Sequence, residues 1–448
     1  MTKLRLRDLA PCFEGVIPSI VATAAADGTP NISYLSHVLC VDDDHVALSN
    51  QFFAKTAANI RANPYVTLIL VDCCTGNQYL LDIRFVGSMD TGPLFDKISL
   101  QLKASSAQVG MADVMRLKSA DIFRVQSIEC VPSPVETAPP ASQRAPVSLP
   151  AIAEAGRAIE RQLDAEGIID ALLDGVERSL GIQNALVLMR DAPRDCFVTT
   201  GSIGYDRSGL GSEVAGDEGL IGAAARSRQS VRVSDMSRVR RFGAAITTDS
   251  SSEEGTRTIA FPQLHGAMSH IAVPMKVRDD VIGVLFAESL DRMAFRDEDE
   301  AALEILASQA AHTLITSEKI ASNADAVFSV PAGRARPDGR DIRVTHHRLD
   351  DSIFIDGTYI VKGIAGALLR LMLEWHRDDG RSEFSNRELR LALAPRMPEI
   401  KDNLETRLLL LRRRLEEKRA SIQLLRTGRG RLRLEPDGPL NLVIAALD

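Results

Sequence analysis

The sequence has few aromatic residues, few cysteines and no long apolar run, and each shortage excludes a class of protein. No window approaches the eighteen or more uncharged apolar residues of a membrane-spanning helix, and the first residues lack the apolar segment of a secretory signal. The six cysteines are scattered, and only Cys73 and Cys74 are close, as a vicinal pair that seldom forms a disulfide without strain. Neither a disulfide framework nor a zinc pattern is visible, so we expect a soluble cytoplasmic protein that does not contact a membrane.

The distribution of charge is uneven. The chain of 448 residues has a net charge of −7, but 11 Lys and Arg stand against 4 Asp and Glu between Lys401 and Leu434. A basic block in an acidic protein indicates a polyanionic partner, although a solvated helix face has the same composition.

Two segments rich in proline, alanine or glycine have the composition of linkers, residues 133–150 and 323–339. They divide the chain into residues 1–132, 151–322 and 340–448. A length of 448 residues also exceeds one ordinary core. We therefore expect three domains.

Hydrophobic patterns predict a different fold for each domain. The first alternates six short β-rich runs with helices at about 53–62 and 93–105, which favours a small barrel. The second begins and ends with amphipathic helices around a strand-rich middle, which favours an α+β domain with its terminal helices free to pair with a second copy. The third has leading strands, helices at about 363–377, 385–393 and 399–419, and two strands around a Gly-Arg-Gly turn.

The first domain contains the stretch HVALSNQFFAKTAANIRANPYVTLIL, the hairpin ADGTPNIS and the ending DVMRLKSADIFRV. These residues resemble the pyridoxamine 5′-phosphate oxidase-like split barrel, a family that binds FMN. By position, the resemblance implies that Ser49 and Asn50 face the ribityl chain and phosphate and that Lys55 and Thr56 hold the phosphate. A lysine, a hydroxyl and the free N–H groups of a helix start suit an anion independently. Asp82 is a fifth candidate contact, where the oxidases tend to show an amide.

The resemblance is incomplete on the second strand. Oxidases of this family carry basic residues there for a phosphorylated substrate, whereas NISYLSHVLC has only His37. Turnover of a pyridoxine substrate is therefore not expected. Because some relatives bind haem, His37 is also a conceivable haem ligand, and a barrel that binds nothing and serves for oligomerisation is a further alternative.

The second domain contains GDEGLIGAAARSRQSVRVSD and HIAVPMKVRDDVIGVLFAES, which resemble a GAF domain. GAF domains are small-molecule sensors or dimerisation modules, so the resemblance implies an unknown small ligand. The long loop 240–266 is a candidate pocket cover or a plain insertion. His265 and His270 are too few for a metal site, and Cys196 is a weak candidate thiol sensor.

The third domain resembles the winged-helix DNA-binding domain of response-regulator-type transcription factors over about 341–436. The resemblance rests on the leading strands, NRELRLAL, NLETRLLLLRRRLEEK and the basic turn. Ser385-Asn386 reads as a helix cap. In the candidate recognition helix we expect four leucines to pack inward, namely Leu404, Leu408, Leu411 and Leu415. Leu409 and Leu410, where relatives commonly carry charged residues, are expected to be exposed and either to touch thymine methyl groups or to form a protein contact. The candidate DNA contacts are Arg407, Arg413, Arg414, Arg429 and Arg431.

Together these patterns predict a multidomain protein: a β split barrel, an α/β GAF domain and a winged helix-turn-helix. We expect a homodimeric, ligand- or redox-responsive transcriptional regulator of double-stranded DNA, with the helix at about 298–320 carrying the signal. The alternative is a flavin-dependent oxidoreductase with accessory regulatory domains. Because hydride chemistry belongs to the flavin, the absence of a catalytic motif does not decide between them.

Overall fold

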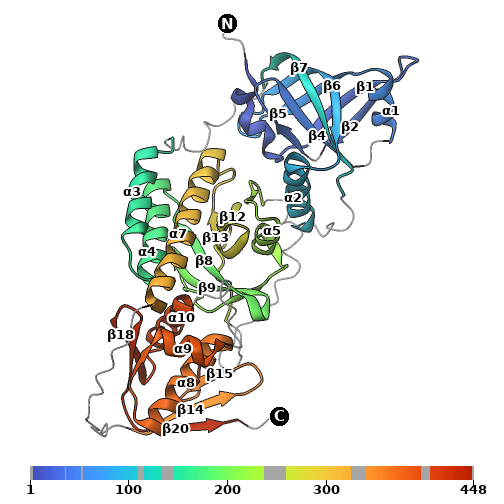
Figure 1. The fold of residues 1–448 in the computed structure, drawn as a ribbon. Coiled ribbons are helices and arrows are strands. Elements are labelled where there is room, and N and C mark those ends of the chain that lie inside the picture. Colours follow the sequence, from blue (N-terminus) through green and yellow to red (C-terminus); the bar gives the residue numbers. More distant parts are fainter. Residues whose placement is uncertain are drawn as a thin grey trace.

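The computed structural model describes residues 4–35, 37–51, 54–108, 116–133, 146–236, 259–323, 340–394 and 404–445. Figure 1 shows three bodies arranged one after another, which we name the N-terminal domain (to residue 133), the central domain (146–323) and the C-terminal domain (from residue 340). Within these residues, no helix combines the length and apolar character that crossing a membrane requires.

The N-terminal domain is a seven-stranded antiparallel sheet in the order β2-β1-β5-β6-β7-β4-β3. Its strands are β1 (Ser19–Ala24), β2 (Pro30–Leu35), β3 (Val38–Cys40), β4 (His45–Asn50), β5 (Tyr65–Val71), β6 (Gln78–Met89) and β7 (Ser119–Val131). The sequence predicted six strands, because NISYLSHVLC reads as one run where the structure has β2 and β3. A short helix, η1 (Leu6–Glu14), packs on the core, and α1 (Ala54–Ala62) and α2 (Pro93–Gln108) match the two predicted helices.

The central domain is a six-stranded antiparallel sheet with helices on both faces. Its strands, in the order β10-β9-β8-β13-β12-β11, are β8 (Asn184–Asp191), β9 (Cys196–Ile203), β10 (Glu213–Ala215), β11 (Val231–Val233), β12 (Ser269–Val277) and β13 (Asp280–Ser289); η2 (Ala192–Arg194) joins β8 to β9. Three helices lie together on one face, α3 (Leu149–Glu160), α4 (Ala165–Leu180) and α7 (Asp297–Asn323), and α5 (Gly219–Ser227) covers the other (Figure 1).

The C-terminal domain places three helices between two small sheets. The first sheet has the order β16-β15-β14-β20, with β14 (Ile342–His347), β15 (Ser352–Ile355), β16 (Thr358–Val361) and β20 (Leu440–Ile444). The second sheet, β17-β19-β18, contains β17 (Glu383–Ser385), β18 (Ile422–Gly428) and β19 (Arg431–Pro436). The helices are α8 (Gly363–Asp379), α9 (Asn386–Ala392) and α10 (Leu404–Glu417). The predicted cap of α9 is confirmed, because Ser385 and Glu388 form a capping box.

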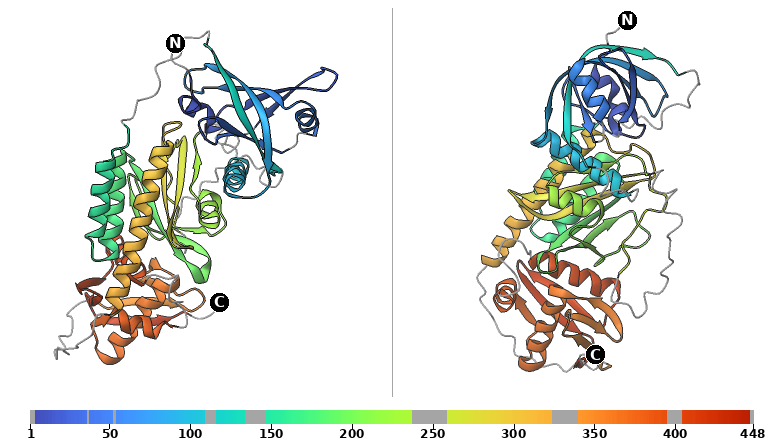
Figure 2. Two further views of the ribbon diagram at one scale, coloured as in Figure 1. Left: turned by 45° about the horizontal axis from the view of Figure 1, so that its top comes forward. Right: turned by 90° about the vertical axis from the view of Figure 1, so that its right-hand side faces the viewer.

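The central and C-terminal domains each contribute side chains to the hydrophobic core of the other. Leu409 of α10 belongs to the core of the central domain, whereas Cys196 and Val198 of β9 belong to the core of the C-terminal domain. At the other joint, α2 of the N-terminal domain lies beside α5 (Figure 2), with Leu100 packed on that face of the central sheet. Helix α7 extends between the two joints over 27 residues, or about 40 Å at 1.5 Å per residue.

Candidate functional site

Three of the predicted cofactor ligands come together where β4 ends and α1 begins. Ser49, Asn50 and Thr56 line a hollow of about 10 Å³, which by itself holds no organic cofactor. Ser49 Oγ accepts a hydrogen bond from the backbone N–H of His37 at 3.2 Å, and Asn50 donates to Asp121 at 3.1 Å. Part of the predicted donor set is thus engaged by the protein itself.

The start of α1 offers a second polar group. Lys55 is exposed there, and the buried Thr56 accepts from Asn31 Nδ2 at 3.0 Å, with its hydroxyl 2.8 Å from Ser33 Oγ. An exposed lysine beside hydroxyl and amide groups at a helix start fits an anion such as a phosphate.

Asp82, the fifth candidate, lies on a different secondary-structure element from the other four. It sits on β6, where its carboxylate accepts from Thr67 at 3.3 Å and from Ser127 at 2.9 Å. Along this strand, Asp82 lies roughly 20 Å from Ser88, which donates to Asp121 beside Asn50. Its partner Thr67 is paired with Ala22 of β1, so Asp82 lies two strands from the end of β1 that adjoins the Thr56 group.

A larger cavity lies at the joint between the N-terminal and central domains. It measures about 550 Å³, a volume typical of small-molecule sites, and is lined by η1, α2, β11 and the start of α7. His37 lines it, and burial lowers the pKa of this histidine to about 4, so its ring is neutral at pH 7. Lys97 of α2 also lines the cavity.

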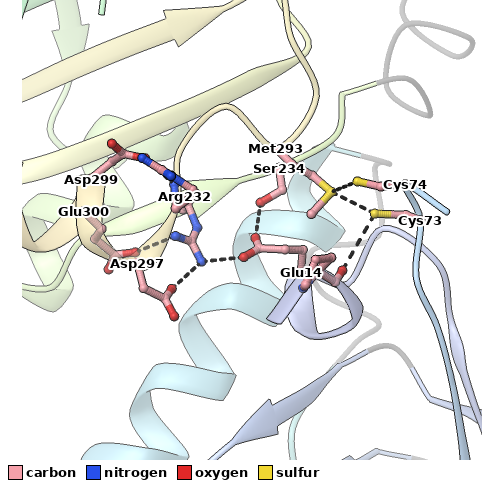
Figure 3. A network of polar contacts seen from close by, with 11 residues as sticks. Glu14, Cys73, Cys74, Arg232, Ser234, Met293, Asp297, Asp299 and Glu300 are labelled. Carbon is pink, nitrogen blue, oxygen red and sulfur yellow. Dashed lines mark hydrogen bonds and ion pairs between the residues drawn. The ribbon is translucent and has the colours of Figure 1, made fainter. Parts of the chain in front are cut away.

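One arginine at this cavity is surrounded by three carboxylates. Arg232 Nη2 lies 2.9 Å from Glu14 and 2.8 Å from Asp297, and its Nη1 lies 3.5 Å from Glu300 (Figure 3). Glu14 also accepts from the Ser234 hydroxyl at 2.5 Å. Burial raises the pKa of Glu14 and of Glu300, and Arg232 only partly opposes it. The joint therefore contains more buried carboxylate than its arginine neutralises.

The predicted DNA-contacting helix, α10, is buried at the other joint. Arg407, only 2% exposed, donates to the carbonyl oxygen of Arg190 at 2.5 Å and lies 3.6 Å from Asp191. Arg413 donates to the carbonyl oxygen of Thr200 at 2.8 Å and to Asp170. All four of these acceptors belong to the central domain.

Three further arginines complete this joint or lie beside it. Arg412 pairs with Glu166, and Arg426 lies 3.1 Å from Asp164. Arg414, in contrast, is held inside the C-terminal domain by the carbonyl of Ile360 at 3.0 Å and by Glu417.

Four inward leucines were predicted correctly, and two exposed ones were predicted wrongly. Leu404, Leu408, Leu411 and Leu415 are all buried in the C-terminal core. Leu409 and Leu410 are each only 5% exposed. Leu409 inserts into the core of the central domain and Leu410 into that of the C-terminal domain, because α10 is packed between the two.

The basic turn between β18 and β19 is the exposed part of the predicted DNA-binding surface. Arg429 and Arg431 are both exposed. Gly430 between them has φ +65°, and a side chain there would meet the carbonyl of Ala321 on α7 at 2.8 Å. The turn therefore rests against the carboxyl-terminal end of α7.

Comparison with known families assigns two of the three domains. The pyridoxamine 5′-phosphate oxidase model matches residues 9–126, and the GAF domain model matches residues 164–314. The chain thus contains a GAF domain and a pyridoxamine 5′-phosphate oxidase-type domain. Both matches lie inside the domain ranges predicted from the sequence, and the winged-helix prediction is matched by neither. A comparison with curated proteins found no match.

Similar solved structures each cover one domain. The GAF domain of an Acinetobacter phosphoenolpyruvate-protein phosphotransferase is 18% identical, with a TM-score of 0.33, and covers 40% of this chain and 97% of its own. An FMN-binding protein from Syntrophomonas wolfei is 17% identical, with a TM-score of 0.25, and covers 28% of this chain and 88% of its own. HupZ of Group A Streptococcus is 20% identical, with a TM-score of 0.23, and covers 30% of this chain and 98% of its own.

The GAF domain contains no histidine metal cluster among the residues described. His265 is exposed, and His270 lies 3.2 Å from Glu288, which also accepts from Tyr205 at 2.9 Å. Most of the proposed pocket cover, residues 240–258, lies outside the described residues. Cys196 is buried in β9, and burial raises its pKa to about 11, which does not favour a reactive thiolate.

The sequence did not reveal the residues that form the two joints. Glu14 and Arg232 are 218 positions apart, and Arg407 and Arg190 are 217 apart. The one sequence signal for the second joint was the doublet Leu409-Leu410, which was expected to be exposed and to contact either thymine methyl groups or protein.

Proposed function

We propose that the chain is a DNA-binding transcriptional regulator whose first two domains sense a small molecule or a redox state. The order of elements in the C-terminal domain supports this proposal: leading strands, three helices and a β-hairpin with a basic turn, as in winged helices. The exposed Arg429 and Arg431 would contact phosphates or a groove edge.

The observation that carries the proposal is that arginines of α10 are paired with acceptors of the GAF domain. Arg407 and Arg413 make forked contacts with carboxylates and carbonyl oxygens, which are the same kinds of acceptor that phosphates and guanine edges present. In this arrangement α10 cannot enter a major groove, so we interpret it as the closed form. DNA binding would then require the two domains to separate, whereas Arg414 would remain a structural residue.

Helix α7 is the proposed route between the sensing joint and α10. At its start, Asp297 and Glu300 contact Arg232 beside the cavity. At its end, Glu318 accepts from the backbone N–H of Leu404 at 2.8 Å and pairs with Arg390 of α9. A ligand that favours one position of α7 would change how strongly the central domain holds α10. This requires that the ligand binds the closed and the open form with different affinity.

The test is to loosen the closed form from the GAF side. Glu166→Gln combined with Asp170→Asn removes the carboxylates that the central domain offers to Arg412 and Arg413, and leaves the sequence of the C-terminal domain unchanged. Because both carboxylates are partly exposed, we expect the double substitution to destabilise the closed form by about 1 kcal/mol. The variant should therefore bind a fluorescent mixed-sequence duplex about five- to tenfold more tightly than the wild type in dilute buffer.

Asp174→Asn is the matched control, since Asp174 lies on the same helix and pairs with Arg178 of that helix. Adding Arg429→Ala and Arg431→Ala to the loosened variant should weaken binding again and reduce its salt dependence. If neither the wild type nor the loosened variant binds the duplex at low salt, the chain is not a DNA-binding regulator.

We further propose that the N-terminal domain binds FMN, with its phosphate at Lys55 and Thr56. The fit rests on the donors at the start of α1, while Ser49, Asn50 and Asp82 remain predicted contacts. Lys55→Ala with Thr56→Ala should lower flavin retention, measured by absorbance after desalting. Arg61→Ala, at the other end of α1, is the control and should retain the flavin. Equal retention in all three proteins would place the phosphate elsewhere.

We also propose that the chain acts as a homodimer. Large apolar side chains stay exposed on α7 and on the strands of the N-terminal domain, including Ile305, Ile32, Tyr34 and Tyr65. Such faces are typical of subunit contacts, and a two-fold pair of C-terminal domains would suit paired half-sites. Light scattering at micromolar concentration should give twice the chain mass, and a monomer there would reject this part of the proposal.

A further inference from the structure

Three sulfur atoms meet where the oxidase-type domain touches the GAF domain. Cys73 and Cys74 lie in the turn between β5 and β6, and Met293 lies between β13 and α7. The Cys73 thiol donates to Met293 Sδ at 2.8 Å, and Cys74 Sγ lies 3.8 Å from the same atom (Figure 3). Ligand atoms of Asp72, Cys73 and Cys74 also lie within 4.8 Å of one another, in the only such cluster found among the described residues.

The turn that carries the two cysteines is fixed by Asp72. Its carboxylate accepts from the backbone N–H groups of Cys74 at 2.8 Å and of Thr75 at 3.2 Å. Its carbonyl accepts from Gly76 at 2.8 Å, which closes the turn. An Asp turn of this kind holds consecutive residues in one conformation, so both thiols are kept toward the GAF domain.

The methionine on the opposite side is held in an unfavourable backbone conformation. Met293 has φ +55°, in the left-handed region that side chains other than glycine seldom adopt. Its backbone N–H donates to the carbonyl of Ser234 at 2.8 Å, which stabilises this conformation. Such conformations cost about 1–3 kcal/mol and are concentrated at functional sites, so the placement of this thioether requires an explanation.

We propose that Cys73, Cys74 and Met293 bind a soft metal ion, Cu(I), with the Asp72 carboxylate beside them. Thiolate and thioether ligands select Cu(I) over hard cations such as Mg²⁺ or Ca²⁺. Metal–thiolate bonds of about 2.3 Å place two ligand atoms of one ion about 3.8 to 4.6 Å apart. Cys74 and Met293 already have this spacing at 3.8 Å, whereas Cys73, at 2.8 Å from Met293, must move away from it for the ion to enter. Binding would release both thiol protons to solvent and leave the two thiolates and the thioether on the ion.

A thiol-based redox switch is the less favoured use of the same cysteines. Vicinal cysteines seldom form a disulfide with each other without strain. A vicinal Cys73–Cys74 disulfide would also leave Met293 without a role.

The position of the ion would connect two domains. Met293 donates to Ser234, whose hydroxyl donates to Glu14 beside Arg232, so the metal site adjoins the wall of the 550 Å³ cavity. Occupancy would therefore fasten the oxidase-type domain to the GAF domain. Metal binding itself does not require the chain to bind DNA, so the two proposals fail separately.

The test is a Cu(I) titration of the reduced full-length protein under anaerobic conditions, with bicinchoninate as the competing chelator. We expect one equivalent of Cu(I) to be withdrawn from the chelator. Cys73→Ser and Cys74→Ser should each weaken binding by about 100-fold or more and Met293→Leu by about tenfold. Cys130→Ser, which removes an exposed thiol on β7, is the control and should bind as the wild type does.

A second measurement uses the unaltered protein, so that a folding defect in a variant does not decide the result. Ag(I), a redox-inert substitute for Cu(I), should protect the exposed Cys74 from alkylation by iodoacetamide at one equivalent, as mapped by mass spectrometry. The proposal is overturned if Cu(I) stays on the chelator, if the double variant Cys73→Ser/Cys74→Ser binds as tightly as the wild type, or if Zn(II) binds in preference to Cu(I).

Discussion

The two joints of the GAF domain lie at opposite ends of α7 and are built differently. At the joint with the oxidase-type domain, the guanidinium of Arg232 pairs with three carboxylates beside a cavity of about 550 Å³. At the joint with the C-terminal domain, Arg407, Arg412 and Arg413 contact several acceptors of the central domain, with Glu166 shared by the last two. The hollow beside Arg412 measures only about 20 Å³.

This difference suggests a division of roles. The first joint has space and uncompensated negative charge, so a third component, whether a small molecule or a metal ion, can change its energy. The second joint is filled, and packed interfaces of this kind change between discrete arrangements instead of deforming gradually. Under the proposed function, the first joint would receive the signal and the second would release α10.

The largest expected effect is at the filled joint. Arg407→Ala leaves the nearly inaccessible Asp191 with one partner fewer and opens a space beside β8. We expect the free energy of unfolding, measured in urea, to fall by about 2–4 kcal/mol. Arg178→Ala removes an exposed pair within α4 and should change it by less than about 0.5 kcal/mol. Equal effects of the two variants would contradict the contrast between the joints.

A paired change at the two ends of α7 compares the joints directly. Glu318→Gln removes the ion pair with Arg390 at the filled end, and a loss of about 1–2 kcal/mol in urea unfolding is expected. Asp297→Asn removes an 84% exposed carboxylate at the open end, where Arg232 keeps Glu14 and Glu300. Its effect should stay within about 0.5 kcal/mol. A larger loss from Asp297→Asn would reverse the proposed order of the two joints.

The smallest expected effect is a dependence on pH at the open joint. Burial raises the pKa of Glu14 above its ordinary 4.5, with Asp297 adding to the rise and Arg232, Ser234 and Lys97 opposing it. The folded state therefore binds this proton more readily than the unfolded state does. The resulting stabilisation is complete below the ordinary pKa and is lost as the pH rises through the raised one.

Glu14→Gln imitates the protonated form at every pH. We expect the variant to be the more stable protein near neutral pH and the difference in free energy of unfolding to shrink as the pH is lowered to about 5. Parallel stability curves for the two proteins would show that Glu14 is charged throughout.

Much of the fold followed from local pattern. Alternating apolar residues predicted the strands, and Ser385-Asn386 predicted the start of α9. The inner face of α10 was predicted from the spacing of four leucines, Leu404, Leu408, Leu411 and Leu415. These features depend on neighbours a few positions away, which a single sequence displays.

The joints could not be predicted in this way. A helix packed between two domains has a buried face for each, and the second face of α10 consists of arginines paired with GAF carboxylates around Leu409. In the sequence, such arginines look like solvent-exposed or DNA-contacting residues. The sequence likewise gives no sign that Met293 contacts Cys73, 220 positions away. The left-handed backbone conformation of Met293 can be seen only in the structure.

The exchange of core residues between the central and C-terminal domains bears on how such proteins diversify. Leu409 completes the core of the GAF domain, and Cys196 and Val198 complete the core of the C-terminal domain. A recombination event that replaced only one of these two domains would therefore leave a cavity in the core of the other. We expect these two modules to be inherited as a unit, whereas the flavin-type module in front can be replaced with far less repair.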